Sequence, residues 1–143
     1  MERRSFIRSS CNLCLLGAAG ILLPQLTSCG PSKYAVYKAQ VNNNIIEVPL
    51  TLFSQSTIQF VRPGNSYFDI AVQKKEDGTY LALLLQCTHQ ENQLIPISNG
   101  YQCSLHGSLF DNNGKVKKGP AEQPLEQYKT FIQQDKLIIQ IKA

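Results

Sequence analysis

Two cysteines and two histidines, in two short segments, are the residues of this chain best suited to chemistry. The first segment holds Cys87 and His89, and the second holds Cys103 and His106, with thirteen residues between His89 and Cys103. The chain has no other histidine. Two thiolates and two imidazoles make a closed set of four ligands, which suits either one tetrahedral zinc ion or a two-iron cluster. Spacing alone does not decide between these two centres.

A disulfide between Cys87 and Cys103 is the simplest alternative to a metal centre, because bridges are the usual use of cysteines in exported proteins. Such a bridge would leave both histidines without a role, although each follows closely on one of these cysteines. A further pair, Cys11 and Cys14, lies in an apolar run without the βαβ pattern that surrounds a redox Cys-x-x-Cys motif. We therefore favour a metal centre over a disulfide.

The segments that must position these residues are rich in strand-forming side chains. Runs of Val, Ile, Tyr, Phe and Leu recur between turn signals such as Asp77-Gly78, and no stretch has helical periodicity. The alternating run 66–72 predicts a strand whose aromatic side chains, Tyr67 and Phe68, pack in the core. We expect an all-β antiparallel sandwich or barrel, with the four candidate ligands converging from two adjacent loops. The expected strands cover residues 34–41, 44–50, 56–61, 67–73, 79–86, the region of Phe131 and 137–141.

The N-terminal segment has the pattern of an export signal. Arg3, Arg4 and Arg8 precede an apolar stretch from Leu13 to Leu23, which a proline ends before a short run of small residues. A positively charged start, an apolar middle and a short run of small residues at the end are typical of such signals. The apolar stretch is too short for a stable membrane span, which needs about 20 residues of helix.

Two resemblances refine this prediction. Residues 3–8 resemble a twin-arginine export signal, and residues 26–29 resemble the lipobox of a bacterial lipoprotein. Together they imply that Cys29 becomes a lipidated N-terminus, which would hold the protein on the periplasmic face of a bacterial membrane, inner or outer. The expected organisation is a signal peptide over 1–28, a lipidated N-terminus and tether over 29–40, and a folded domain over 41–143.

The cysteine and histidine segments resemble the Rieske [2Fe–2S] family. Its pattern is C-x-H, then thirteen to twenty-odd residues, then C-x-x-H-G, and this chain carries it from Cys87 to Gly107. The run 106–111 resembles the H-G-S-x-[YF]-D sequence after the second segment, and residues 119–125 resemble the proline-bearing loop that covers the cluster. The resemblance covers roughly residues 40 to 143. It implies a Rieske-like antiparallel β sandwich with a small cluster-binding subdomain made of two loops.

The resemblance also implies a site with one [2Fe–2S] cluster per chain. One iron would be bound by the two cysteines and the other by the two histidines, which places the potential at about −150 to +300 mV rather than the roughly −400 mV of all-cysteine ferredoxins. The ring nitrogens that do not bind iron can carry protons, so electron and proton uptake can be linked. The implied ligands are Cys87, His89, Cys103 and His106, and the implied residues around the cluster are Gly107, Ser108, Phe110 and Pro120.

The chain departs from the Rieske subunits of quinol-oxidising cytochrome bc complexes at three positions. Those subunits have an extra cysteine in each segment, joined in a disulfide, where this chain has Asn92 and Leu105. Their tyrosine that hydrogen-bonds a ligand sulfur is matched here by Phe110, whereas Ser108 keeps the hydroxyl that can bond a bridging sulfide. Fewer donors to sulfur lower a cluster potential, so we expect a potential below that of the quinol-oxidising subunits.

These features predict an electron carrier or an oxidoreductase subunit rather than a stand-alone enzyme. A cluster with four protein ligands has no open coordination position, so no catalytic residue is expected. The leading expectation is an exported, membrane-tethered electron-transfer protein that serves a cytochrome or membrane oxidoreductase; the alternatives are a quinol-oxidising cytochrome bc subunit and, third, a structural zinc module. Without residues 1–28 the chain holds 11 basic and 9 acidic side chains. This near-neutral balance does not indicate a protein that binds nucleic acid.

Overall fold

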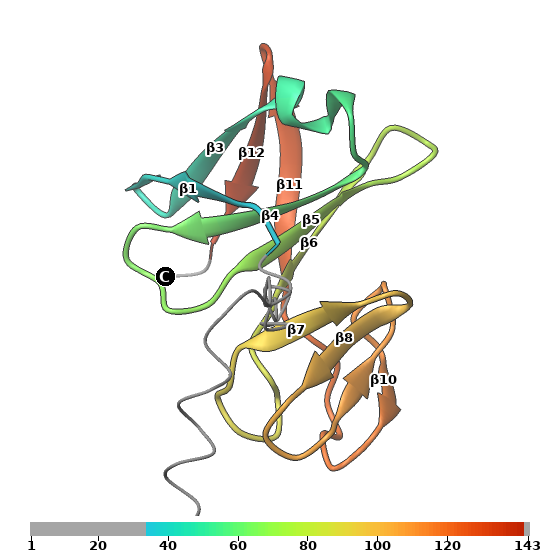
Figure 1. The fold of residues 1–143 in the computed structure, drawn as a ribbon. Helices are drawn as coiled ribbons and strands as arrows, with labels where there is room; N and C mark the ends of the chain where they lie inside the picture. The colour runs from blue at the N-terminus through green and yellow to red at the C-terminus, as the bar shows by residue number, and fades with distance from the viewer. Residues whose placement is uncertain (1–33, 142–143) are drawn as a thin grey trace, which may run out of the picture. The chain divides into compact units, whose positions relative to one another are not determined.

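The computed structural model describes residues 34–141, which belong to one compact unit that begins at Tyr34. Twelve strands and one short 3-10 helix, η1, make up this part of the chain, which confirms the all-β prediction (Figure 1). The predicted signal peptide, lipobox and Cys29 lie outside the described residues. Within residues 34–141, no helix is both long and apolar enough to cross a membrane.

Eight strands form the larger sheet, in the order β1-β4-β5-β6-β11-β12-β3-β2. Most neighbours are antiparallel, but β1 runs parallel to β4, with Val36 opposite Phe60. The strands are β1 (Val36–Ala39), β2 (Val41–Asn42), β3 (Ile45–Pro49), β4 (Ile58–Pro63), β5 (Ile70–Lys74), β6 (Tyr80–Leu84), β11 (Gln127–Gln133) and β12 (Lys136–Gln140), with η1 (Leu50–Ser54) between β3 and β4.

The larger sheet encloses its own core, because inward side chains from its two halves meet. Val61, Val72 and Ala82 of β4–β6 belong to the same buried cluster as Ile46 of β3 and Ile139 of β12. The alternation of apolar and polar residues along these strands follows from the period of two, since successive side chains point to opposite faces. The result is a sandwich-like arrangement.

Four short strands form a second sheet in the order β10-β9-β8-β7. They are β7 (Leu94–Ile97), β8 (Gly100–Cys103), β9 (Leu109–Phe110) and β10 (Val116–Lys118). The cluster-binding subdomain expected as two loops therefore also contains a small sheet. Strand β7 lies at its edge, where Pro96 is tolerated because an edge strand has one side without ladder partners.

Strand β6 and the residue after it join the two sheets. Ala82 and Leu84 face the core of the larger sheet, whereas Leu81, Leu83 and Leu85 belong to a second core with residues of the small sheet. A strand buried on both faces needs apolar residues at successive positions, which explains the unbroken run of apolar side chains from 80 to 85. This run ends two residues before the first candidate ligand.

Two details differ from the sequence prediction. Residues 34–40 belong to the folded unit, so the expected boundary between tether and domain at residue 41 moves back to Tyr34. The predicted strand over 67–73 begins only at Ile70, and Tyr67 is 88% exposed instead of packing in the core. The reason is local: Ser66 Oγ accepts a hydrogen bond from the backbone N–H of Phe68, which forms a turn before the strand.

Candidate metal centre

The two cysteine–histidine segments lie at the ends of strands, as predicted. Cys87 lies shortly after the end of β6. The residue before it, Gln86, forms an isolated β-bridge with Gln93. Cys103 is the last residue of β8 and stands opposite Leu94 of β7. Strand β7 begins shortly after the first segment and pairs with β8, the strand that leads to the second segment. The β7–β8 hairpin therefore brings the two segments together.

The two cysteines are buried side by side as free thiols. Cys87 is 3% exposed and Cys103 is 1% exposed, and both belong to the second core. No disulfide joins their sulfur atoms. The alternative of a disulfide between these residues is therefore wrong for the described structure.

The two histidines form a second pair, which lies at the surface. The ring centroids of His89 and His106 are 5.2 Å apart, with an angle of 83° between the ring planes, and both residues are exposed. Within residues 34–141, no group of three or more Cys, His, Asp or Glu side chains is arranged to hold a single metal ion. The four candidate ligands are thus arranged as a buried sulfur pair and an exposed imidazole pair.

Cys103 lies in a turn whose donors favour a thiolate. Burial by itself raises the pKa of this thiol, but hydrogen bonds from the backbone N–H groups of His106 and Leu105 and from the side chains of Cys87 and Asn92 outweigh it and lower the pKa. The turn is closed by two backbone bonds, from Gly107 N to Cys103 O (3.0 Å) and from Cys103 N to Ser108 O (2.9 Å). A thiolate is the form that binds metal, so this environment suits a ligand.

The other residues that the resemblance pointed to surround this turn. Gly107 has φ +77°, a left-handed conformation that a residue with a side chain adopts only with strain. Ser108 is fully buried, and its Oγ accepts a 3.0 Å hydrogen bond from Ala121 N in the loop after Pro120. Phe110 is also fully buried, whereas Pro120 itself is exposed. The loop over 119–126 is therefore held to the second segment through Ser108.

Two side-chain contacts near the site were not predicted from the sequence. Thr88, between the first cysteine and histidine, donates a 2.7 Å hydrogen bond from Oγ1 to the carbonyl of Gln123, so the same loop is also held to the first segment. Asn92 places its Nδ2 atom 3.6 Å from the Sγ atom of Cys103. The sequence marked Asn92 only as a position without a cysteine, and nothing in its spacing indicated a contact with sulfur.

The profile of the Rieske [2Fe-2S] domain matches residues 32–129. The chain belongs to this family. The matched range takes in both cysteine–histidine segments and the loop over 119–126, and Rieske domains bind a [2Fe–2S] cluster, so this cofactor is established for the chain.

Several relatives by sequence are subunits of cytochrome complexes. The cytochrome b6-f complex iron-sulfur subunit of Chlorobaculum thiosulfatiphilum is 28% identical over 142 residues, which covers 96% of this Rieske chain and 75% of that subunit. The corresponding subunit of Gloeobacter violaceus is 30% identical over 82 residues, which covers 55% of this chain and 43% of that protein. The chain thus spans three quarters of one relative and less than half of the other.

Solved structures have the same fold. The cyanobacterial plasma membrane Rieske protein of Synechocystis PCC 6803 superposes with a TM-score of 0.53 and 25% identity, covering 66% of this chain and 95% of that one. A chain from the complex of oxygenase and ferredoxin in carbazole 1,9a-dioxygenase gives a TM-score of 0.51 at 19% identity, covering 69% and 94%. The second likeness concerns the fold alone.

The donor set fits the cluster. A Rieske centre takes two cysteines and two histidines, and this chain offers a buried sulfur pair beside an exposed imidazole pair. The separation into like pairs matches a centre in which each iron has its own kind of ligand.

Proposed function

We propose that this protein is an exported, membrane-tethered Rieske electron carrier, with Cys87 and Cys103 as ligands of one iron and His89 and His106 as ligands of the other. The observation that carries the ligand assignment is the pairing described above: both cysteines are buried in the same core, and the two imidazoles lie together at the surface. When bound, the cluster supplies one-electron transfer at the potentials typical of mixed cysteine and histidine ligation.

The surrounding residues support this role. Ser108 accepts a hydrogen bond from Ala121 N, which leaves its hydroxyl proton to donate toward the cluster, while Phe110 and the loop over 119–126 keep water from the sulfur side. The exposed imidazoles give a partner a short path for electrons and, through their second ring nitrogens, a place to exchange a proton or to hydrogen-bond a quinol. The direction of transfer follows from the partner's potential.

The ligand assignment is tested by counting iron and acid-labile sulfide in the purified chain and in Cys87→Ser, Cys103→Ser, His89→Ala and His106→Ala. We expect two irons and two sulfides in the parent and near-complete loss of both in each variant, because one of the two irons then keeps only one of its two protein ligands. Gln90→Ala and Gln102→Ala, at exposed residues next to the two segments, are matched controls that should keep the cluster. A parent chain with one zinc and no iron would contradict the proposal.

The export and anchoring parts of the proposal rest on the sequence near the N-terminus. The twin-arginine pattern at 3–8 and the lipobox at 26–29 support a lipid on Cys29, and the related plasma membrane Rieske protein supports a place at a membrane. Mass spectrometry of the protein recovered from membranes tests this. We expect a mature chain that starts at an acylated Cys29, and in Cys29→Ala an uncleaved chain without lipid; an unmodified Cys29 inside a longer chain would contradict it.

A second candidate, a quinol-oxidising subunit beside a cytochrome b, is favoured by the likeness to the cytochrome b6-f subunit across 96% of this chain. Against it stand Asn92 and Leu105, which replace the two cysteines of the disulfide found in those subunits. Co-purification from native membranes separates the two proposals. A stable assembly containing a b-type cytochrome would favour the subunit, and a Rieske protein that elutes alone would favour the carrier.

A further inference from the structure

Asn92 contacts both cysteine–histidine segments at once. Its backbone carbonyl accepts a 2.9 Å hydrogen bond from the N–H of Cys87. Its side-chain Nδ2 lies 3.6 Å from Sγ of Cys103 and 3.5 Å from Oγ of Ser104. A single residue therefore holds the first segment through its backbone and the second through its side chain.

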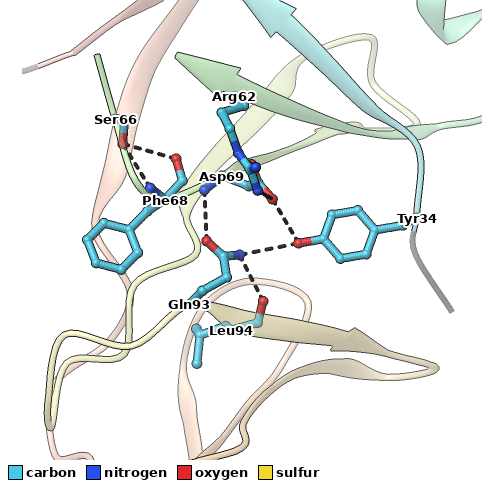
Figure 2. A network of polar contacts seen from close by, with 7 residues as sticks. All are labelled: Tyr34, Arg62, Ser66, Phe68, Asp69, Gln93 and Leu94. Carbon is cyan, nitrogen blue, oxygen red and sulfur yellow. Dashed lines mark hydrogen bonds and ion pairs between the residues drawn. The ribbon is translucent and has the colours of Figure 1, made fainter. Parts of the chain in front are cut away.

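The neighbour of Asn92 fixes its position in the fold. Gln93 Oε1 accepts a 3.0 Å hydrogen bond from the backbone N–H of Asp69, and Gln93 Nε2 donates to the hydroxyl of Tyr34 (3.3 Å) and to the carbonyl of Leu94 (2.9 Å) (Figure 2). Asp69 is fully buried, so this network anchors the start of β7 to the larger sheet. Asn92 therefore stands on a rigid support rather than in a free loop.

The chemistry of the contact sets the orientation of the amide. A cysteine thiolate can only accept hydrogen bonds, so the NH₂ group of Asn92 and not its carbonyl oxygen must face Sγ of Cys103. The same NH₂ group also donates to the backbone carbonyl of Gln93 at 3.2 Å, which directs its second proton away from the sulfur. The remaining N–H is shared between Sγ of Cys103 and Oγ of Ser104, which lie 3.6 and 3.5 Å from Nδ2.

We propose that Asn92 is a positioning residue that raises the reduction potential of the cluster by donating a hydrogen bond to Sγ of Cys103. This inference rests on the proposed ligand set, in which Cys103 binds iron. One-electron reduction adds a negative charge that spreads onto the ligand sulfurs, so a donor to sulfur stabilises the reduced state more than the oxidised state. Removal of the donor must then shift the equilibrium toward the oxidised state.

The test is a redox titration of the iron-loaded protein and of Asn92→Ala and Asn92→Asp. Alanine removes the donor, and aspartate keeps the shape while it replaces the donor with a negatively charged acceptor. We expect the ratio of reduced to oxidised cluster at a fixed ambient potential to fall about tenfold in Asn92→Ala, which is about 59 mV for a one-electron couple, and further in Asn92→Asp. Asn112→Asp, the same change at an exposed turn residue, should leave the potential unchanged.

A second readout uses the parent protein, in case a variant loses its cluster. Selective ¹⁵N labelling of asparagine should give a weak hyperfine coupling to the reduced cluster in pulsed electron paramagnetic resonance, retained in Asn112→Asp. An unchanged potential in Asn92→Ala with the cluster intact, or the absence of the ¹⁵N coupling in the parent, would overturn the role of Asn92 and leave the proposed function standing. A parent chain that binds no iron would instead overturn the proposed function and this inference with it.

Discussion

The hydroxyl of Tyr34 donates a 2.8 Å hydrogen bond to Oδ2 of Asp69, a carboxylate without exposed surface (Figure 2). Arg62 donates to the same carboxylate through Nε at 2.6 Å and through a terminal nitrogen at 2.9 Å. Tyr34 is thus tied, at the start of the folded unit, to the residue that also supports Gln93 beside the metal centre. The start of the folded unit is therefore linked by hydrogen bonds to the residue that supports the cysteine–histidine segments.

Replacement of Asp69 by alanine should destabilise the fold strongly. The buried carboxylate satisfies Tyr34 and Arg62, and its loss leaves donors of both without a partner, although Arg62 is partly exposed and can regain water. We expect a loss of about 2 to 3 kcal/mol in the free energy of unfolding, measured with urea. Glu47→Ala is the matched control, because the Glu47–Lys136 ion pair is about half exposed on both sides and is screened by solvent. Equal losses in the two variants would contradict this prediction.

Stability should fall at high pH through Tyr34. Burial, together with the hydrogen bond to Asp69 and its charge, raises the pKa of Tyr34 to about 12, against about 10 in an unfolded chain. A raised pKa means that the stabilisation is complete below pH 10 and is lost as the pH rises toward 12. Tyr34→Phe should therefore show a shallower fall in unfolding free energy between pH 10 and 12. Burial raises the pKa of Tyr101 to about 12 as well, so part of the fall should remain in the variant.

The control for this alkaline effect is Tyr67→Phe, at a residue that is 88% exposed. Its profile between pH 10 and 12 should match that of the parent protein. A Tyr34→Phe profile identical to that of Tyr67→Phe would contradict the assignment of the effect to Tyr34.

Two glycines near the site should differ in their tolerance of alanine. At Gly100, with φ +139°, a Cβ atom would lie 1.9 Å from the carbonyl oxygen of Phe110, so the β8–β9 pairing would have to open. At Gly107, with φ +77°, nothing lies within 4 Å of the added atom, and only the backbone strain remains. We expect losses of about 3 kcal/mol or more for Gly100→Ala and about 1 kcal/mol for Gly107→Ala in urea unfolding.

Gly78→Ala supplies the reference for strain alone. Gly78 has φ +82° and open space around it in the turn between β5 and β6. The loss of unfolding free energy in Gly78→Ala should equal that in Gly107→Ala. If Gly100→Ala loses no more unfolding free energy than Gly78→Ala, the predicted clash with the carbonyl of Phe110 would be contradicted.

Phe110→Tyr should raise the reduction potential. Phe110 is fully buried in the second core with both candidate ligand sulfurs, and the Rieske subunits of cytochrome bc complexes carry at the matching position a tyrosine whose hydroxyl bonds a ligand sulfur. An added donor stabilises the reduced state, so the potential measured by redox titration should rise toward that of those subunits. Phe60→Tyr, at a residue at the border of the same core, is the control. An unchanged potential in Phe110→Tyr with an intact cluster would contradict this prediction.

The sequence predicted the larger sheet well and the small sheet poorly. Strand β3 alternates and β6 is apolar throughout, and both patterns are visible in the sequence alone. Strand β7 contains Pro96, a residue that is rare inside strands, and β9 and β10 are only two and three residues long. These strands persist because they pack on the outer face of β6, a contact that no local pattern reveals.

The candidate ligands were predictable because their residue types are rare and their spacing is distinctive, whereas their supports were not. The buried carboxylate of Asp69 accepts hydrogen bonds from residues 34 and 62, and its backbone N–H donates to residue 93, so only the folded chain brings these partners together. Asn92 was noted for the cysteine that it replaces, and its contact with Cys103 depends on the β7–β8 hairpin. Polar networks of this kind form only in the folded chain and leave no local pattern in the sequence. Metal ligands can be recognised in the sequence from their residue types and spacing.

Electron paramagnetic resonance of the purified protein tests whether this chain holds a Rieske cluster on the four proposed ligands. The oxidised protein should be silent, and the reduced protein should give a rhombic signal with a mean g value below that of the free electron, with one reduced cluster per chain and loss of the signal in Cys103→Ser. A signal of this kind with two irons per chain would establish the Rieske centre on these ligands. A protein that stays silent after reduction and holds one zinc ion would contradict the account.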